Sequence, residues 1–184
     1  VSGGTATATV GFAAEKSNGQ KGYVITGHLP SQTGLTIYQP SVGSSAGSVG
    51  GISGSHADAA WVPFNNVQAT LFEGSGNLLP VKSYRDPNKS EVVMMSGLTS
   101  GTTSGRVTVV GADLEDQNGR TLYYQSIASY SATGGDSGAP VYRKDSNHDI
   151  ILGGIHWGHH EVIGSTFSPI SGVINDLDIT PLTR

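Results

Sequence analysis

Residues 134–140 read Gly-Gly-Asp-Ser-Gly-Ala-Pro, and the interpretation of the whole sequence starts from this stretch. The stretch follows a polar segment and precedes the strand-like pair Val141-Tyr142. A serine flanked by glycines can present its hydroxyl from a tight turn. In such a turn the backbone N–H groups of Gly135 and Ser137 can point to one spot, which is the geometry that stabilises a developing oxyanion. The stretch therefore predicts one half of an acyl-transfer site.

The other half of such a site is a base that accepts the hydroxyl proton and a carboxylate that orients the base. Six histidines are available, and His28 directly follows the apolar run of residues 23–27. Asp58 opens a second apolar run, residues 58–64. Because strands hold side chains more rigidly than free loops do, both residues suit a preorganised site.

The pattern of apolar residues predicts many strands and few helices. Short β-branched runs alternate with turn residues, and the hairpin-forming pairs Asn18-Gly19, Gly76-Asn77 and Asn118-Gly119 lie between them. One helix is expected near residues 169–177, where apolar residues recur at helical spacing. The expected strands cover residues 6–14, 21–26, 36–38, 59–63, 68–72, 91–96, 105–110, 122–126, 138–142, 150–155 and 165–168.

Composition excludes several classes of function. The 184 residues are enough to bury a real core, and the absence of cysteine excludes disulfides, thiolate zinc sites and a cysteine nucleophile. Only 13% of residues are charged and the formal net charge is −4, without a basic run longer than Arg143-Lys144. We therefore expect neither nucleic acid nor membrane as a partner, and no apolar stretch is long enough to span a bilayer.

Two segments interrupt the β pattern. Residues 79–90 carry Pro80, Pro87 and a cluster of charges, and we interpret them as a connector between two lobes, residues 1–82 and 83–184. Residues 39–55 are nearly all Gly, Ser and Val, and form either an exposed hairpin or a loose loop. The chain starts at Val1 rather than Met, which we interpret as processing or trimming. Its low charge and abundant Gly, Ser and Thr are commoner in exported proteins, so we expect secretion.

Four motifs follow one another along the chain: Thr26-Gly27-His28, Asp58-Ala59-Ala60-Trp61-Val62, Gly135-Asp136-Ser137-Gly138 and Ile155-His156-Trp157-Gly158. Together they resemble the chymotrypsin-like serine peptidases in their short bacterial, streptogrisin-type form. The start of the chain and residues 100–110 are also similar to that family, so the resemblance spans nearly the whole sequence. The order His, Asp, Ser is the one that chymotrypsin folds use, whereas subtilisins and α/β-hydrolases use other orders.

The resemblance implies an all-β fold of two packed antiparallel six-stranded β-barrels with a short C-terminal helix. Residues 1–82 would form the first barrel with His28 and Asp58, and residues 83–184 the second barrel with Ser137 and the specificity pocket. It implies Ser137 as nucleophile, His28 as general base and then acid, Asp58 as its orienting partner, and the amides of Gly135 and Ser137 as the oxyanion hole. The protein would be a secreted, monomeric endopeptidase acting on polypeptides without a cofactor. Gly27 and Leu29 depart from the alanine and cysteine usual beside the histidine.

The pocket for the side chain before the scissile bond leaves two preferences open. None of the expected pocket residues is acidic, so a basic side chain would lack a countercharge. His156 could fill space beside Trp157 for an apolar or aromatic side chain, or read a glutamate carboxylate, as in the glutamyl endopeptidases that this pocket resembles. Ala132 departs from the threonine of those enzymes. The expected substrate-binding residues are Ser131, Ala132, Thr133, His156, Trp157, Gly158 and Ser168.

Further interpretations compete with this one. His156, His159 and His160 resemble a metal cluster, but residues three apart on a strand do not share a face, so we expect no metal site. Asp136 is expected to be a buried structural carboxylate, with Val1 or Arg106 as candidates for neutralising it, and Asp113, Glu115 and Asp116 a solvated turn. An inactive two-barrel binding module and an esterase are the alternative functions.

Overall fold

The computed structural model describes residues 1–3, 6–30, 32–40, 43–74 and 76–184. Gly4 and residues 41–42 of the loose segment 39–55 lie outside this part. Strands form most of the regular structure, and the one helix that the described residues contain is α1 (Ile170–Leu177). The strands are β1 (Ser2–Gly3), β2 (Ala6–Thr7), β3 (Ala13–Lys16), β4 (Lys21–Ile25), β5 (Thr36–Tyr38), β6 (Ser45–Ser48), β7 (Gly51–Ile52), β8 (Ala60–Pro63), β9 (Thr70–Glu73), β10 (Asn77–Tyr84), β11 (Val92–Gly97), β12 (Gly101–Glu115), β13 (Thr121–Ala128), β14 (Pro140–Lys144), β15 (Ile150–His160), β16 (Gly164–Pro169) and β17 (Ile179–Pro181).

The C-terminal half of the chain closes into a six-stranded barrel. Its strands pair in the order β14-β11-β12-β13-β16-β15, and β14 pairs with β15 to complete the ring. Closure leaves no free edge inside the ring, which removes a site for unwanted strand pairing. Alternate side chains point inward, and Met95, Val107, Tyr130 and Phe167 fill one buried cluster.

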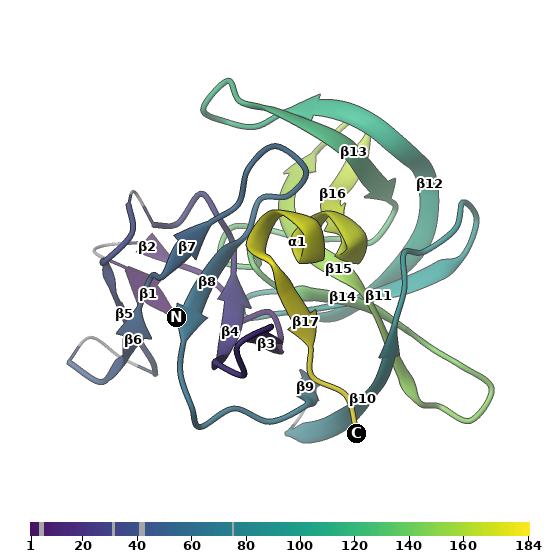
Figure 1. The fold of residues 1–184 in the computed structure, drawn as a ribbon. Coiled ribbons are helices and arrows are strands. Elements are labelled where there is room, and N and C mark those ends of the chain that lie inside the picture. Colours follow the sequence, from purple (N-terminus) through teal and green to yellow (C-terminus); the bar gives the residue numbers. More distant parts are fainter. Residues whose placement is uncertain (4–5, 31, 41–42, 75) are drawn as a thin grey trace.

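The N-terminal half forms two sheets rather than a closed ring. In the described residues β2-β1-β5-β6 make a four-stranded sheet, and β17-β3-β4-β8-β7 make a five-stranded one. Tyr23, Ile25, Ile37 and Val62 form the buried cluster of this half. Figure 1 shows β1 to β8 in purple and blue on one side of the molecule, the teal to yellow-green barrel on the other, and the yellow β17 between them.

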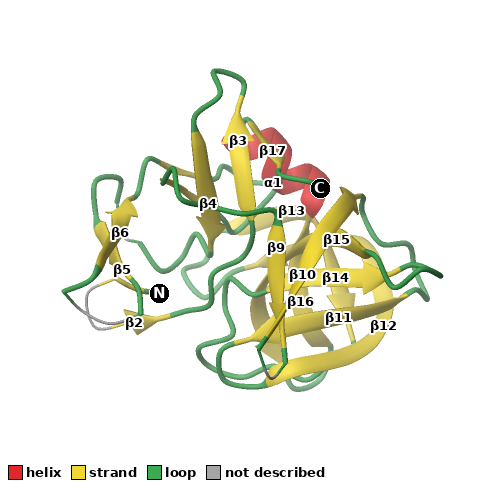
Figure 2. Cartoon of the chain, turned by 90° about the horizontal axis from the view of Figure 1, so that it is seen from below, coloured by secondary structure: helices red, strands yellow, loops and turns green. Residues whose placement is uncertain are grey.

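The chain end ties the halves together. After β16, helix α1 buries Ile170, Val173 and Leu177, and β17 then pairs with β3 of the N-terminal half (Figure 2). A shared core cluster joins Trp61 of the first half to Ile155 of the second. The two halves are therefore fixed relative to each other by apolar packing, which at about 1.5–3 kcal/mol per large buried side chain is a strong constraint.

The all-β fold and the C-terminal helix are confirmed, with three local corrections. The predicted strand 6–14 is interrupted between β2 and β3, and the predicted connector 79–90 begins as strand, because β10 runs through Pro80 to Tyr84. β10 pairs with β9 antiparallel and with β15 in parallel, so the sheets are not wholly antiparallel. Strand β17 was not predicted, because its three residues are too few to show an alternation of apolar and polar side chains. The boundary between residues 82 and 83 stays a prediction.

Candidate active site

His28 and Asp58 contact each other in the N-terminal half, next to the end of β4 and the start of β8. His28 Nδ1 lies 2.6 Å from Asp58 Oδ2, and the Asp58 side chain is fully buried while that of His28 is 17% exposed. The Thr26 hydroxyl donates to the same Oδ2 at 2.5 Å. A proton on Nδ1 donates to this carboxylate, which leaves Nε2 as the basic nitrogen of the ring.

Close backbone packing explains how the two residues reach each other. His28 follows β4 and Asp58 precedes β8, and Ile25 of β4 pairs with Ala60 of β8. A Cβ on Gly27 would lie 2.7 Å from the Ala59 nitrogen, closer than real contacts allow. Glycine at position 27, which departs from the pattern of the similar enzymes, is thus required by this close approach.

The loop before β14 presents Ser137 and two free amides. Gly135 has φ +98°, and its carbonyl accepts a hydrogen bond from the Thr9 hydroxyl at 2.9 Å. The Ser137 carbonyl accepts from the Thr9 amide at 2.9 Å. Within the described part of the chain, neither the Gly135 nor the Ser137 N–H donates to a protein acceptor. Two uncommitted N–H groups in one turn are what an oxyanion hole needs.

One cavity of 630 Å³ contains both His28 and Ser137 in its wall. Among the described residues no direct hydrogen bond joins the Ser137 hydroxyl to the imidazole. Catalytic hydrogen bonds are often long without substrate and shorten in the complex, so this geometry is compatible with a nucleophile and its base.

The cavity continues to a second, more deeply buried histidine. His156 is 2% exposed, and its Nδ1 lies 3.0 Å from the Tyr130 hydroxyl. Burial lowers the pKa of His156 to about 4, and the negative charge of Asp136 only partly opposes this effect. Burial also raises the pKa of Tyr130, which keeps its hydroxyl protonated as a donor. The imidazole in this part of the cavity is therefore neutral near pH 7.

Asp136 is buried and is held by backbone amides. Its Oδ1 accepts from the Thr99 and Ser100 amides at 2.8 and 3.1 Å, and its Oδ2 accepts from Thr133 at 2.9 Å. Burial raises the pKa of Asp136, but these hydrogen bonds outweigh burial and lower it overall. Neither expected partner is correct: Val1 donates to the Ala8 carbonyl and Arg106 to the Ser90 carbonyl.

Solved structures of other proteins share the fold of this chain, although its sequence matches no known family. No family profile and no curated protein sequence matches the chain. Among solved structures, a glutamic acid specific serine protease, described as using a histidine triad in substrate binding, superposes with a TM-score of 0.84 at 22% identity, covering 98% of this chain and 96% of its own. Thermobifida fusca protease A gives 0.81 at 22% identity, covering 98% and 94%. Cellulomonas bogoriensis chymotrypsin gives 0.77 at 24% identity, covering 100% and 99%.

The fold is that of the bacterial chymotrypsin-like serine proteases. The similarity in structure extends over nearly the whole of each chain, whereas the sequences are only 22–24% identical. Within the described residues, no helix is long and apolar enough to cross a bilayer, and no group of three or more His, Asp or Glu side chains is arranged to hold a metal ion.

In this chymotrypsin-like fold the structure gathers most of the expected binding residues and places two elsewhere. Ala132, Thr133, His156, Trp157 and Gly158 line the cavity with His28 and Ser137. Ser131 is exposed outside the lining, and its carbonyl accepts from the Thr103 hydroxyl. Ser168 is fully buried: its hydroxyl accepts from the Asp58 amide at 2.9 Å and donates to Gln125 at 2.8 Å. Ser168 thus supports Asp58.

Sequence reasoning missed an arginine and several acidic residues. Arg120, in the β12–β13 hairpin, donates from Nη2 to Asp58 Oδ1 at 2.9 Å. Asp116 is not part of a solvated turn, because it is buried and pairs with Arg120 Nε at 3.0 Å. Glu115, Asp116 and Glu161 also line the cavity, although all the expected pocket residues are uncharged or histidine. Only the Asn118-Gly119 turn in the sequence indicated a hairpin, and nothing indicated where its side chains reach.

Proposed function

We propose that the protein is a serine endopeptidase that cuts peptide bonds through an acyl-enzyme formed on Ser137. The observation that carries this proposal is the 2.6 Å contact between His28 Nδ1 and the buried Asp58, at a cavity shared with Ser137. The uncommitted amides of Gly135 and Ser137 support it, and so does the fold. A fold alone does not give a function, so the argument depends on these side chains.

In the proposed reaction the same groups serve both the formation and the hydrolysis of the acyl-enzyme, and His28 acts in each step first as a base and then as an acid. His28 Nε2 removes the Ser137 proton as Oγ attacks the peptide carbonyl carbon, and the carbonyl oxygen becomes an oxyanion facing the two amides. The C–N bond then breaks, and the leaving amine takes the proton from His28. A water molecule repeats the attack on the ester: it gives its proton to His28, which returns it to Ser137 Oγ as the acid product leaves.

Replacement of Ser137 by alanine tests the proposal. We expect peptide hydrolysis to fall by several orders of magnitude while the thermal unfolding midpoint stays close to wild type. A fluorophosphonate should label the wild-type protein stoichiometrically and leave Ser137→Ala unlabelled. Ser83→Ala, which changes an exposed serine on β10, is the matched control and should retain both properties. Absence of labelling and hydrolysis in the wild type would favour the inactive binding module. Ester cleavage without peptide cleavage would favour an esterase.

For the side chain before the scissile bond we propose glutamate, with an apolar or aromatic side chain as the alternative. Neutral His156 would donate a ring N–H to the substrate carboxylate while Tyr130 occupies Nδ1. Thr166 lines the same cavity, and its buried hydroxyl has no partner among the described residues, so it can replace the threonine missing at Ala132. The similar protease with a named glutamate specificity also uses histidines in substrate binding. His159 and His160 line this cavity too.

A peptide library profiled for the residue before the cut separates these preferences. We expect Glu to be cleaved about 100-fold faster than Gln or Phe, and His156→Ala to lose that ratio, since one charge-assisted hydrogen bond is worth about 1.5–3 kcal/mol. Because His156 is neutral above about pH 4, the Glu-to-Gln ratio should stay constant from about pH 6 to pH 9. A ratio that falls steadily over this range would show that the imidazolium is the binding form. An unchanged profile in His156→Ala would eliminate the glutamate proposal.

The remaining proposals concern context. We propose a secreted monomer acting on polypeptides, supported by the low charge content of the sequence. Light scattering of the purified protein and its recovery from culture medium test these two points.

We also propose that the chain divides into two lobes, residues 1–82 and 83–184. Strand β10 crosses this boundary and pairs with both β9 and β15. Hydrogen exchange that divides into two protection classes at this boundary would support it.

A further inference from the structure

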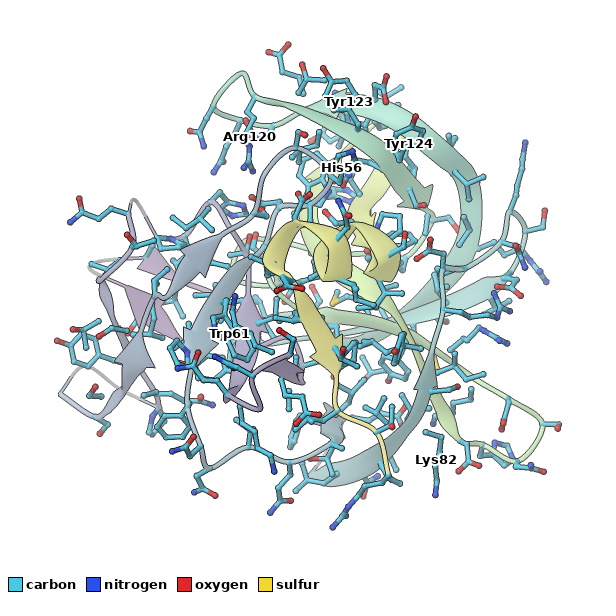
Figure 3. The ribbon with its side chains drawn as sticks, in the orientation of Figure 1. His56, Trp61, Lys82, Arg120, Tyr123 and Tyr124 are labelled. Atoms are coloured by element: carbon cyan, nitrogen blue, oxygen red, sulfur yellow. The ribbon has the colours of Figure 1, made fainter. Side chains whose placement is uncertain are left out.

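We propose that Arg120 is a positioning residue, which holds Asp58 in the orientation that the His28 contact requires and sets the pH range in which the site is active. This inference rests on the proposed peptidase function. Arg120 lies in the hairpin between β12 and β13, close to the segment that carries His56 (Figure 3). Asp58 precedes β8 in the other half of the molecule, 62 residues away in sequence.

The two oxygens of Asp58 have different partners. Oδ2 accepts from Thr26 at 2.5 Å and His28 at 2.6 Å, whereas Oδ1 accepts from Arg120 Nη2 at 2.9 Å. Rotation of the carboxylate would break contacts on both oxygens at once. The guanidinium therefore fixes the plane of the carboxylate, and with it the direction in which Oδ2 faces the imidazole.

Besides its contact with Asp58, the Arg120 side chain is held by two further hydrogen bonds. Nε donates to Asp116 Oδ2 at 3.0 Å, and Nη1 donates to the Gly54 carbonyl at 3.3 Å. Asp116 Oδ1 in turn accepts from the amides of Asn118 and Arg120 at 2.8 and 2.9 Å, so one carboxylate organises the whole turn. These amides and the guanidinium outweigh burial and lower the pKa of Asp116, which keeps it ionised. The guanidinium thus bridges two carboxylates in a fixed geometry.

The guanidinium also supplies charge where burial makes it valuable. The Asp58 side chain is fully buried, and a buried carboxylate without a partner is strongly destabilising. Lysine would supply the charge but not the planar fork that reaches Asp58, Asp116 and Gly54 together. The Arg120 side chain is 33% exposed, so its charge is partly screened by solvent.

The same charge opposes protonation of His28. The charged or titratable groups around the imidazole are Asp58 in contact and Arg120 and Asp116 behind Asp58, and the same cavity is lined by Glu115, His156, His159, His160 and Glu161. Asp58 favours the imidazolium, while Arg120 disfavours it. Removing the Arg120 charge should therefore favour the protonated ring, and a higher pH will be needed to deprotonate it for catalysis.

The test compares Arg120→Gln, Arg120→Lys and the matched control Arg106→Gln with wild type. For Arg120→Gln we expect kcat to fall by about 10-fold to 100-fold with little change in KM, the cost of one hydrogen bond to a charged group. The acid limb of kcat/KM should move up by about one pH unit. Arg120→Lys should restore the pH profile more than kcat. Arg106→Gln should match wild type, because among the described residues the Arg106 side chain hydrogen-bonds only with the Ser90 carbonyl, on the exposed surface.

A proton NMR signal gives a readout that does not need activity. The Nδ1 proton of His28, donated to Asp58, should be observed far downfield, and its pH midpoint should rise in Arg120→Gln. If wild type lacks peptidase activity but this shift occurs, the proposed function fails and the positioning role stands. If wild type is active and Arg120→Gln keeps its kcat, acid limb and NMR midpoint, the Arg120 proposal is refuted. Circular dichroism and thermal unfolding identify a variant that has misfolded. Asp116→Asn, which keeps the guanidinium but removes one of its partners, should then lower kcat less than Arg120→Gln does, and should move the NMR midpoint in the opposite direction because it removes a negative charge.

Discussion

Two of the histidines that line one cavity, His28 and His156, have surroundings that give them opposite properties. His28 contacts the buried carboxylate of Asp58, whereas His156 contacts the neutral hydroxyl of Tyr130. Burial alone lowers the pKa of an imidazole, as it does for His156. His28 instead faces a carboxylate, whose charge stabilises the imidazolium that forms during catalysis. The nearest hydrogen-bond partner, more than the extent of burial, decides whether a histidine of this cavity suits the role of a base or that of a neutral binding group.

Asp58→Asn should have the largest effect on this difference between the two histidines. An amide at this position removes the charge that stabilises the imidazolium and favours the wrong ring tautomer, so kcat should fall by about 10⁴-fold. Single-turnover measurements with a chromogenic peptide would establish this change. Fluorescence unfolding serves as the control for folding, because Arg120 loses its charged partner in the same variant. A loss of less than about 10-fold would mean that His28 does not act as the base.

The sequence was sufficient for the parts of this contrast that depend on local pattern. The order of His28, Asp58 and Ser137, and the glycines around Ser137, were readable as motifs. Arg120 was not, because its contact with Asp58 joins a hairpin of one half to a strand end of the other, and no local periodicity encodes it. The contact of Ser168 was not readable for a related reason: in the folded chain its hydroxyl accepts from the Asp58 amide, and its predicted role in substrate binding stays a prediction. The pattern of a strand predicts which side chains share a face of the sheet, but not which distant residues that face will contact.

Asp136 gives an intermediate case, a buried carboxylate that binds backbone amides instead of an imidazole. Its pKa is lowered, so its contribution to stability is fully present above the unfolded pKa of about 4 and is lost as pH falls through the lower folded value. Asp136→Asn should cost about 1–3 kcal/mol of unfolding free energy at pH 7, because an amide cannot accept from all three N–H groups. Urea unfolding at several pH values measures this cost.

The difference between Asp136→Asn and wild type should narrow as pH falls below about 4. His156 contributes a separate acid loss, since its lowered pKa means that the unfolded chain binds its proton first. Because the Asp136 charge partly opposes this lowering, the His156 loss is larger in Asp136→Asn until Asp136 of the wild type is itself protonated. Activity should also fall in Asp136→Asn, because the Thr133 amide that Asp136 holds belongs to the loop before Ser137. A difference that stays constant from pH 7 to pH 3 would show that the charge of Asp136 is not what the amides stabilise.

Tyr130→Phe is the mildest change and tests the neutral histidine directly. Loss of the hydroxyl removes the partner of His156 Nδ1, so the ring can adopt either tautomer and its remaining N–H is no longer fixed toward a substrate carboxylate. The Glu-to-Gln ratio of kcat/KM should fall by about 10-fold, while cleavage after Gln changes little, since His28 and Asp58 lie outside this contact. Competition between two peptides in one reaction measures the ratio without errors in enzyme concentration. Equal losses for both peptides would place Tyr130 in the support of the barrel core, where Met95 and Phe167 pack beside it, rather than in recognition.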